Sequence, residues 1–176
     1  MKKRLIAVIL CLIMLTGLAA AQAETAVKPN VTDLLFKYTK LDLNPYKGKT
    51  VVLNFFTEWC YYCMKEMPDL KKVNDMYDPE QFQMVLVHVW DGEDERSTEN
   101  VKEKYGMEHM TFFEDTDRMV ASAVGLMGYP ATIIVGPDGT LVTAINSMIS
   151  DDYLVFELDR AGVGRMPEQE AENDPV

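Results

Sequence analysis

The chain has 176 residues, of which 48% are hydrophobic, and its formal net charge is −11 at pH 7. This length suits a single domain with a sizeable core, and the acidic charge disfavours nucleic acid and anionic membrane surfaces as partners. Three cysteines are too few for a secreted scaffold held together by disulfides.

The first 23 residues have the parts of a secretory signal peptide. Residues 2–4 are basic, residues 5–18 are apolar, and Ala21-Gln22-Ala23 is a small-x-small cleavage pattern. We therefore expect residues 1–23 to be removed and the protein to be periplasmic or otherwise extracytoplasmic. The alternative is an uncleaved membrane anchor, although the apolar run is short for a membrane span. Cys11 lies in this segment, so the mature chain keeps two cysteines.

Residues 24–40 are interpreted as an N-terminal leader that is polar over Glu24–Asn30, with a short helix or strand around Leu34–Tyr38 packing on the domain edge. The run Thr50–Phe56 (TVVLNFF) is mostly β-branched and aromatic, which predicts a strand buried on both faces, as in parallel sheets. Apolar side chains then recur at helical spacing from just after Cys60 to about Tyr77. This pattern predicts a helix that Pro68 should kink.

The second half predicts further strands and helices. Phe82–Trp90 reads as a second buried strand, and an exposed acidic loop, Asp91–Asn100, leads into a helix that runs through Tyr105. A short extended piece, Thr111–Phe113, and a short helix, Arg118–Val124, come next. A hairpin of Ala131–Val135 and Thr140–Ile145 follows, with its turn at Gly136–Gly139, and the last predicted element is a helix at Asp151–Ala161.

The polar, acidic residues 162–176 predict a disordered tail. The order of the elements before this tail is strand, helix, strand, helix, hairpin and helix. It indicates an α/β, thioredoxin-like fold, with a central mixed β-sheet flanked by helices, over residues 41–161.

Residues 57–68 read TEWCYYCMKEMP and contain both remaining cysteines in a Cys-x-x-Cys motif. Half a zinc site, a structural disulfide and a redox-active dithiol would each use this spacing. Zinc needs four ligands in a structural site, and only His88 and His109 could join the pair. A disulfide that closes so small a loop removes little chain entropy. The redox dithiol is therefore favoured.

The predicted start of the helix assigns different roles to the two cysteines. At a helix N-terminus, unpaired N–H groups and the helix dipole stabilise a thiolate, which is the reactive form of cysteine. Cys60 is at this position and is expected to be the exposed nucleophile. Cys63, one turn further on, is placed to attack the resulting mixed disulfide and release the product.

The stretch LNFFTEWCYYCMKEMP, with Gly-Tyr-Pro-Ala-Thr at 128–132, resembles the TlpA/ResA-like family of extracytoplasmic thioredoxins. The resemblance covers about residues 41–161. It implies a thiol–disulfide oxidoreductase that reduces protein disulfides, with a possible part in cytochrome c biogenesis, and a membrane electron donor that re-reduces it. It implies neither a bound cofactor nor a metal.

The resemblance also implies roles for the residues around the motif. Pro130 matches a cis-proline that faces the dithiol, where the backbone of Tyr129 would pair with an extended substrate. Trp59 matches a tryptophan that flanks the site, and Tyr61 and Tyr62 stand between the cysteines. These three aromatic residues either select substrates or form only a hydrophobic rim.

Glu66 matches an acid that the family keeps near the cysteines. Its charge would raise a neighbouring cysteine pKa, and it could accept or return protons during exchange; otherwise it is a solvated helix residue. Cytoplasmic thioredoxins carry a buried aspartate where this chain has Asn54. Any proton-shuttling acid must therefore be Glu66 or the nearby Glu58.

The alternative function is a metal-binding chaperone that holds copper or another metal through Cys60 and Cys63. Copper-carrying relatives of the fold typically have three residues between the cysteines and a histidine ligand, whereas this chain has two. His88 lies in a strand of alternating valines and is interpreted as a core histidine.

Overall fold

The computed structural model describes residues 28–90 and 98–166. The predicted signal peptide lies outside the described residues, as do most of the predicted acidic loop and the end of the predicted tail. None of the described helices is long and apolar enough to cross a membrane.

A mixed five-stranded sheet forms the centre of the molecule, as the sequence predicts. Its strands, in the spatial order β3-β2-β1-β4-β5, pair in parallel from β1 to β2 to β3, while β4 is antiparallel to both of its neighbours. The bounds are Thr50–Phe56 for β1, Phe82–Val89 for β2, Thr111–Asp115 for β3, Ala131–Val135 for β4 and Leu141–Ile145 for β5.

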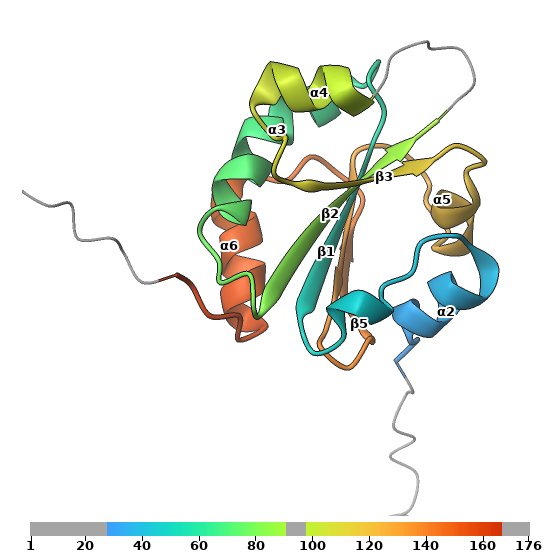
Figure 1. The fold of residues 1–176 in the computed structure, drawn as a ribbon, viewed down its shortest axis with the longest axis vertical. Coiled ribbons are helices and arrows are strands. Elements are labelled where there is room, and N and C mark those ends of the chain that lie inside the picture. The colour runs from blue at the N-terminus through green and yellow to red at the C-terminus, as the bar shows by residue number, and fades with distance from the viewer. Residues whose placement is uncertain (1–27, 91–97, 167–176) are drawn as a thin grey trace, which may run out of the picture.

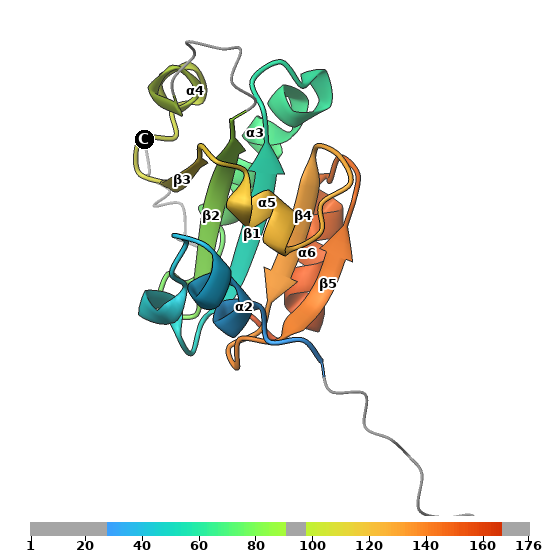
Figure 2. The ribbon, with the colours of Figure 1, turned by 90° about the vertical axis from the view of Figure 1, so that its right-hand side faces the viewer.

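Helices cover both faces of this sheet (Figures 1 and 2). Helices α3 and α6 lie on one face, and α2 and α5 lie on the other. The helices are α2 (Val31–Tyr38), α3 (Tyr61–Asn74), α4 (Thr98–Tyr105), α5 (Met119–Ala123) and α6 (Asp151–Arg160), with a 3₁₀ turn at Asn44–Tyr46. All seven residues of β1 are buried, because alternate side chains enter the two apolar layers.

The short element expected around Leu34–Tyr38 is helix α2, which begins three residues earlier, at Val31, and forms part of the packed domain. Val31 and Leu35 of α2 are buried in the same apolar layer as alternate residues of β1. Asn30 caps the helix by accepting a hydrogen bond from the Asp33 N–H at 2.8 Å. Helix α2 is therefore fixed to the sheet at the end opposite the cysteine motif.

The chain also stays packed beyond residue 161, where the sequence predicted a disordered tail. Val163 is buried beside α3 and α6, and Arg165 forms an isolated β-bridge with Tyr77. The few apolar residues of this polar segment form no helical or strand period, so the sequence gives no sign of this contact. Helix α4 likewise begins at Thr98, inside the predicted acidic loop.

Candidate active site

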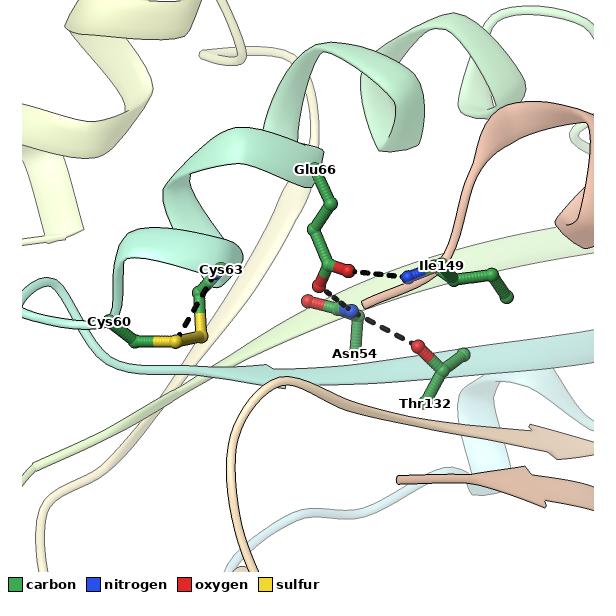
Figure 3. Close-up of a disulfide and its surroundings, with 6 residues drawn as sticks. All are labelled: Asn54, Cys60, Cys63, Glu66, Thr132 and Ile149. Atoms are coloured by element: carbon green, nitrogen blue, oxygen red, sulfur yellow. Dashed lines mark hydrogen bonds between the residues drawn. A yellow bond between two sulfur atoms is a disulfide. The ribbon is translucent and has the colours of Figure 1, made fainter. Parts of the chain in front are cut away.

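The two cysteines form a disulfide at the N-terminus of α3, shortly after the end of β1 (Figure 3). Cys60 is the N-cap of α3, and its Sγ accepts a hydrogen bond from the Cys63 N–H at 3.2 Å. Cys60, which was expected to be exposed, is largely buried, with 6% of its surface exposed, and Cys63 is fully buried. A molecule in solution therefore meets the edge of Cys60 first, with Cys63 behind it.

The local sequence accounts for this position. The buried strand β1 ends at Phe56, and a turn follows in which the Cys60 N–H donates to the Thr57 carbonyl at 3.3 Å. The chain then enters α3, whose first N–H groups have no partner within the helix. A thiolate formed at Cys60 would meet these groups and the positive end of the helix dipole.

Glu66 lies one turn after Cys63 and is buried under α3, with 1% of its surface exposed. Its two carboxyl oxygens accept hydrogen bonds from Asn54 Nδ2 at 2.8 Å and from the Ile149 N–H at 2.9 Å. Asn54 Nδ2 also donates to Thr132 Oγ1 at 3.1 Å. In Figure 3, Cys63 and Glu66 project from the same side of α3, toward the sheet. Glu66 is thus not a solvated helix residue.

Burial raises the pKa of Glu66 to about 7, although the hydrogen bonds from Ile149 and Asn54 lower it and Asp69 raises it slightly. The carboxyl can therefore take up or release a proton near neutral pH. Asn54, fully buried between Glu66 and Thr132, holds the carboxyl in place but cannot itself ionise.

Exposed aromatic side chains surround the disulfide. Trp59, Tyr61 and Tyr62 are each more than half exposed. Trp59 meets the ring of Tyr129 edge-on at 6.4 Å, and Tyr61 meets Tyr62 at 5.4 Å. The Tyr129–Pro130 peptide bond is cis. Trp59, just before Cys60, and Tyr129, in the segment before β4, are therefore in contact in the folded chain.

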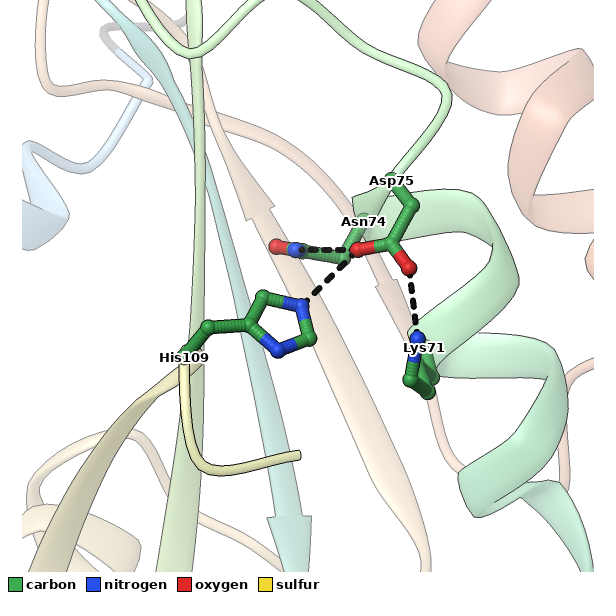
Figure 4. A network of polar contacts seen from close by, with 4 residues as sticks. All are labelled: Lys71, Asn74, Asp75 and His109. Carbon is green, nitrogen blue, oxygen red and sulfur yellow. Dashed lines mark hydrogen bonds and ion pairs between the residues drawn. The ribbon is translucent and has the colours of Figure 1, made fainter. Parts of the chain in front are cut away.

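The two histidines have other partners. His88 is buried, and its Nδ1 lies 3.1 Å from Thr98 Oγ1. His109 binds Asp75 at 2.9 Å beyond the far end of α3, in the polar cluster of Figure 4. Within residues 28–90 and 98–166, no three His, Cys, Asp or Glu side chains come together as a metal site.

Two contacts of the Glu66–Asn54 pair were not identified from the sequence. Thr132 lies in the Gly-Tyr-Pro-Ala-Thr motif, so the sequence marked its position but not its contact with Asn54. The Ile149 N–H is a backbone group in the loop before α6. No side-chain pattern could have indicated it.

A mixed sheet with helices on both faces and a Cys-x-x-Cys disulfide at the start of α3 defines a protein of the thioredoxin fold. The AhpC/TSA family model matches residues 24–144, and the chain belongs to this family.

Named relatives agree with this assignment. The chain is 29% identical over 115 residues to the thiol-disulfide oxidoreductase ResA of Bacillus subtilis, a match covering 65% of this chain and 63% of that protein. It is 28% identical over 141 residues to ResA of Geobacillus kaustophilus, covering 80% and 78%. A secreted Mycobacterium tuberculosis disulfide oxidoreductase homologous to E. coli DsbE superposes with a TM-score of 0.59 at 25% identity, covering 68% and 87%. The sequence resemblance to ResA-like thioredoxins is therefore confirmed.

Proposed function

We propose that this protein is an extracytoplasmic thiol–disulfide oxidoreductase that reduces protein disulfides. One observation carries the proposal: Cys60 caps α3 at the solvent edge, and Cys63 is bonded to it from a fully buried position. This asymmetry suits a pair in which one sulfur meets the substrate and the other resolves the intermediate.

Reduction proceeds in two exchanges. The Cys60 thiolate attacks one sulfur of a substrate disulfide, forms a mixed disulfide and displaces the other substrate sulfur as a thiolate. The Cys63 thiolate then attacks Cys60 Sγ, closes the Cys60–Cys63 disulfide and displaces the second substrate thiolate. Two electrons pass from the dithiol to the substrate, whose two sulfurs leave as thiols once protonated.

Glu66 is the proposed proton acceptor for Cys63. Its position one turn after Cys63, its burial and its pKa of about 7 support this role. The buried Cys63 must lose a proton before it can attack, and a carboxylate beside it can take that proton.

The exposed aromatic residues are proposed to hold the substrate. The contact between Trp59 and Tyr129 joins the two sides of the surface around the disulfide. An extended substrate segment would lie along the backbone at Tyr129 and Pro130, with Tyr61 and Tyr62 beside its cysteine. Oxidised protein thiols are the proposed substrates, apocytochrome c among them.

The reducing direction and the extracytoplasmic location are proposed from the resemblance to the TlpA/ResA-like family. The secreted mycobacterial protein supports an extracytoplasmic site of action. A reductase there must be re-reduced, and we propose an electron donor in the membrane. N-terminal sequencing of exported protein should begin at Glu24, whereas Met1 on a membrane-bound form would favour the uncleaved anchor.

Insulin reduction tests the activity. The wild-type protein should accelerate reduction of insulin disulfides by dithiothreitol, and Cys60→Ala should lose the acceleration. The reduction potential should lie in the reducing range of thioredoxin, at about −270 mV. If insulin is not reduced and copper or zinc binds stoichiometrically in competition with a chelator, the protein is a metal-binding chaperone instead.

A further inference from the structure

The side-chain amide of Asn54 has one unpaired polar atom beneath α3. Asn54 is fully buried, and its Nδ2 donates to Glu66 Oε1 at 2.8 Å and to Thr132 Oγ1 at 3.1 Å. Its carbonyl oxygen, Oδ1, is also buried and has no hydrogen-bond partner in the part of the chain that the structure describes. Buried polar atoms are paired in the great majority of cases, so an unpaired one requires a physical explanation.

The ionised carboxyl group of Glu66 fixes the orientation of this amide. A carboxylate only accepts hydrogen bonds, so Asn54 must turn its nitrogen toward Glu66. The Thr132 hydroxyl can donate or accept and is compatible with this orientation. Oδ1 therefore points away from Glu66. In Figure 3, the Asn54 oxygen is directed toward the side on which the disulfide lies.

The backbone places Cys63 on the same side of the sheet as this oxygen. Asn54 alternates along β1 with Val52 and Phe56, whose side chains belong to the same apolar layer as Cys63. Glu66 follows Cys63 by three residues in α3, and side chains at this spacing are neighbours on a helix. An amide that bonds Glu66 through its nitrogen can therefore present its oxygen to Cys63.

The redox state of Cys63 decides whether this oxygen has a donor. In the oxidised protein, Cys63 Sγ is bonded to Cys60 Sγ and carries no hydrogen. Reduction gives Cys63 a thiol, whose S–H group is a hydrogen-bond donor. We propose that in the reduced protein Asn54 Oδ1 accepts a hydrogen bond from the Cys63 thiol, so that Asn54 is a positioning residue which holds this thiol neutral beside Glu66.

This hydrogen bond would favour one form in each of two equilibria. It stabilises the thiol of Cys63 over the thiolate, because an amide oxygen can accept from S–H but repels a negative sulfur. It also stabilises the dithiol over the disulfide, in which Oδ1 loses its donor. Cys63 would thus stay unreactive until Cys60 holds a mixed disulfide, when Glu66 takes the proton. The inference rests on the proposed function for this last step only.

The infrared S–H stretch of Cys63 tests the hydrogen bond directly. The chain has three cysteines, so the variant Cys11→Ala/Cys60→Ala keeps Cys63 as its single thiol. The spectrum is recorded at about pH 8, where Glu66 is mostly ionised because its pKa is about 7. The S–H band should lie at a lower frequency than that of a thiol without a hydrogen bond. A band at the frequency of a free thiol would overturn the inference.

Two further substitutions in this single-thiol protein identify the acceptor. Asn54→Leu removes the amide at similar volume and should move the S–H band to higher frequency. Thr132→Val is the matched control, because it removes the other side-chain partner of the Asn54 nitrogen and leaves Oδ1 in place. It should leave the band where it was. An unmoved band in Asn54→Leu would assign the thiol hydrogen to another acceptor, and equal shifts in both variants would likewise contradict the proposal.

The dithiol–disulfide equilibrium provides a second test with both redox cysteines present. Asn54→Leu should favour the disulfide about tenfold, which makes the reduction potential about 30 mV more negative. The same shift should appear in the Glu66→Gln background, because it does not depend on the charge of Glu66. A shift that disappears in this background would overturn the inference. Insulin reduction by the wild type is measured alongside, so a missing activity and a missing hydrogen bond are distinguished.

Discussion

Glu66 and Asp115 are equally buried carboxyl groups, each 1% exposed, and each accepts two hydrogen bonds. Asp115 accepts from the backbone N–H groups of Val120 and Ala121, at 3.1 and 2.9 Å, near the start of α5. Glu66 accepts from one backbone N–H and from the side chain of Asn54. The burial is the same, but the surroundings differ.

The two sites differ in how their surroundings stabilise a negatively charged carboxylate. Unpaired N–H groups at a helix start complement a carboxylate, so Asp115 suits a structural role in fixing α5 to the end of β3. Around Glu66 the effect of burial exceeds that of its two hydrogen bonds, and its pKa rises to about 7. Burial alone therefore does not make a carboxyl group a proton acceptor; that role is proposed for Glu66 from its position one turn after Cys63 together with its raised pKa.

Exchanging each acid for its amide should separate the two roles most strongly. Glu66→Gln should slow insulin reduction at pH 7 by about 100-fold, because loss of general acid–base catalysis typically costs 10²- to 10⁴-fold. Asp115→Asn is the matched control. It should keep the rate within about twofold while lowering the melting temperature, since one amide oxygen replaces a charged acceptor. Equal rates for wild type and Glu66→Gln would assign the proton transfer to Glu58 or water.

The stability of the oxidised protein should report the raised pKa of Glu66. The native protein keeps a proton on Glu66 up to about pH 7, whereas the ordinary pKa is 4.5. The stability that this proton contributes is fully present below pH 4.5 and is lost as the pH rises through about 7. Relative to Glu66→Gln, wild type should therefore lose about 3 kcal/mol of unfolding free energy between pH 4 and pH 8. Urea unfolding of both proteins at the two pH values measures this change, and parallel curves would contradict it.

A smaller effect is expected from the aromatic surface. Trp59→Ala should reduce kcat/KM for insulin about 3- to 10-fold, in line with the loss of one aromatic contact, and leave the reduction of a small disulfide unchanged. Phe156→Ala on α6 is the control, because Phe156 is similarly exposed, at 58% against 56%. Equal losses for both substrates would show that Trp59 supports the dithiol itself rather than the substrate.

Much of the fold and part of the site could be predicted from local sequence. The bounds of β1 agree with prediction because most residues from Thr50 to Phe56 favour a buried strand. The start of α3 agrees because the pattern changes directly after Cys60. Glu66 stood out through its spacing from Cys63. Each of these features depends on neighbours within one turn or one strand.

The remaining features depend on contacts between distant parts of the chain. The Ile149 N–H that holds Glu66 and the approach of Glu58 to His88 arise from the topology of the sheet. Which apolar residues of α2 enter the core, Val31 and Leu35 rather than Phe36, is decided by the face that α2 turns to the sheet. Asp115 was not singled out at all, although its burial equals that of Glu66.

Brief alkylation of the reduced protein tests the central claim, that Cys60 is the reactive thiol and Cys63 the protected one. After a short pulse of iodoacetamide near neutral pH, mass spectrometry should find the label on Cys60 and almost none on Cys63, because Cys60 caps α3 at the solvent edge and Cys63 is fully buried. Preferential labelling of Cys63, or equal labelling of both, would contradict the account.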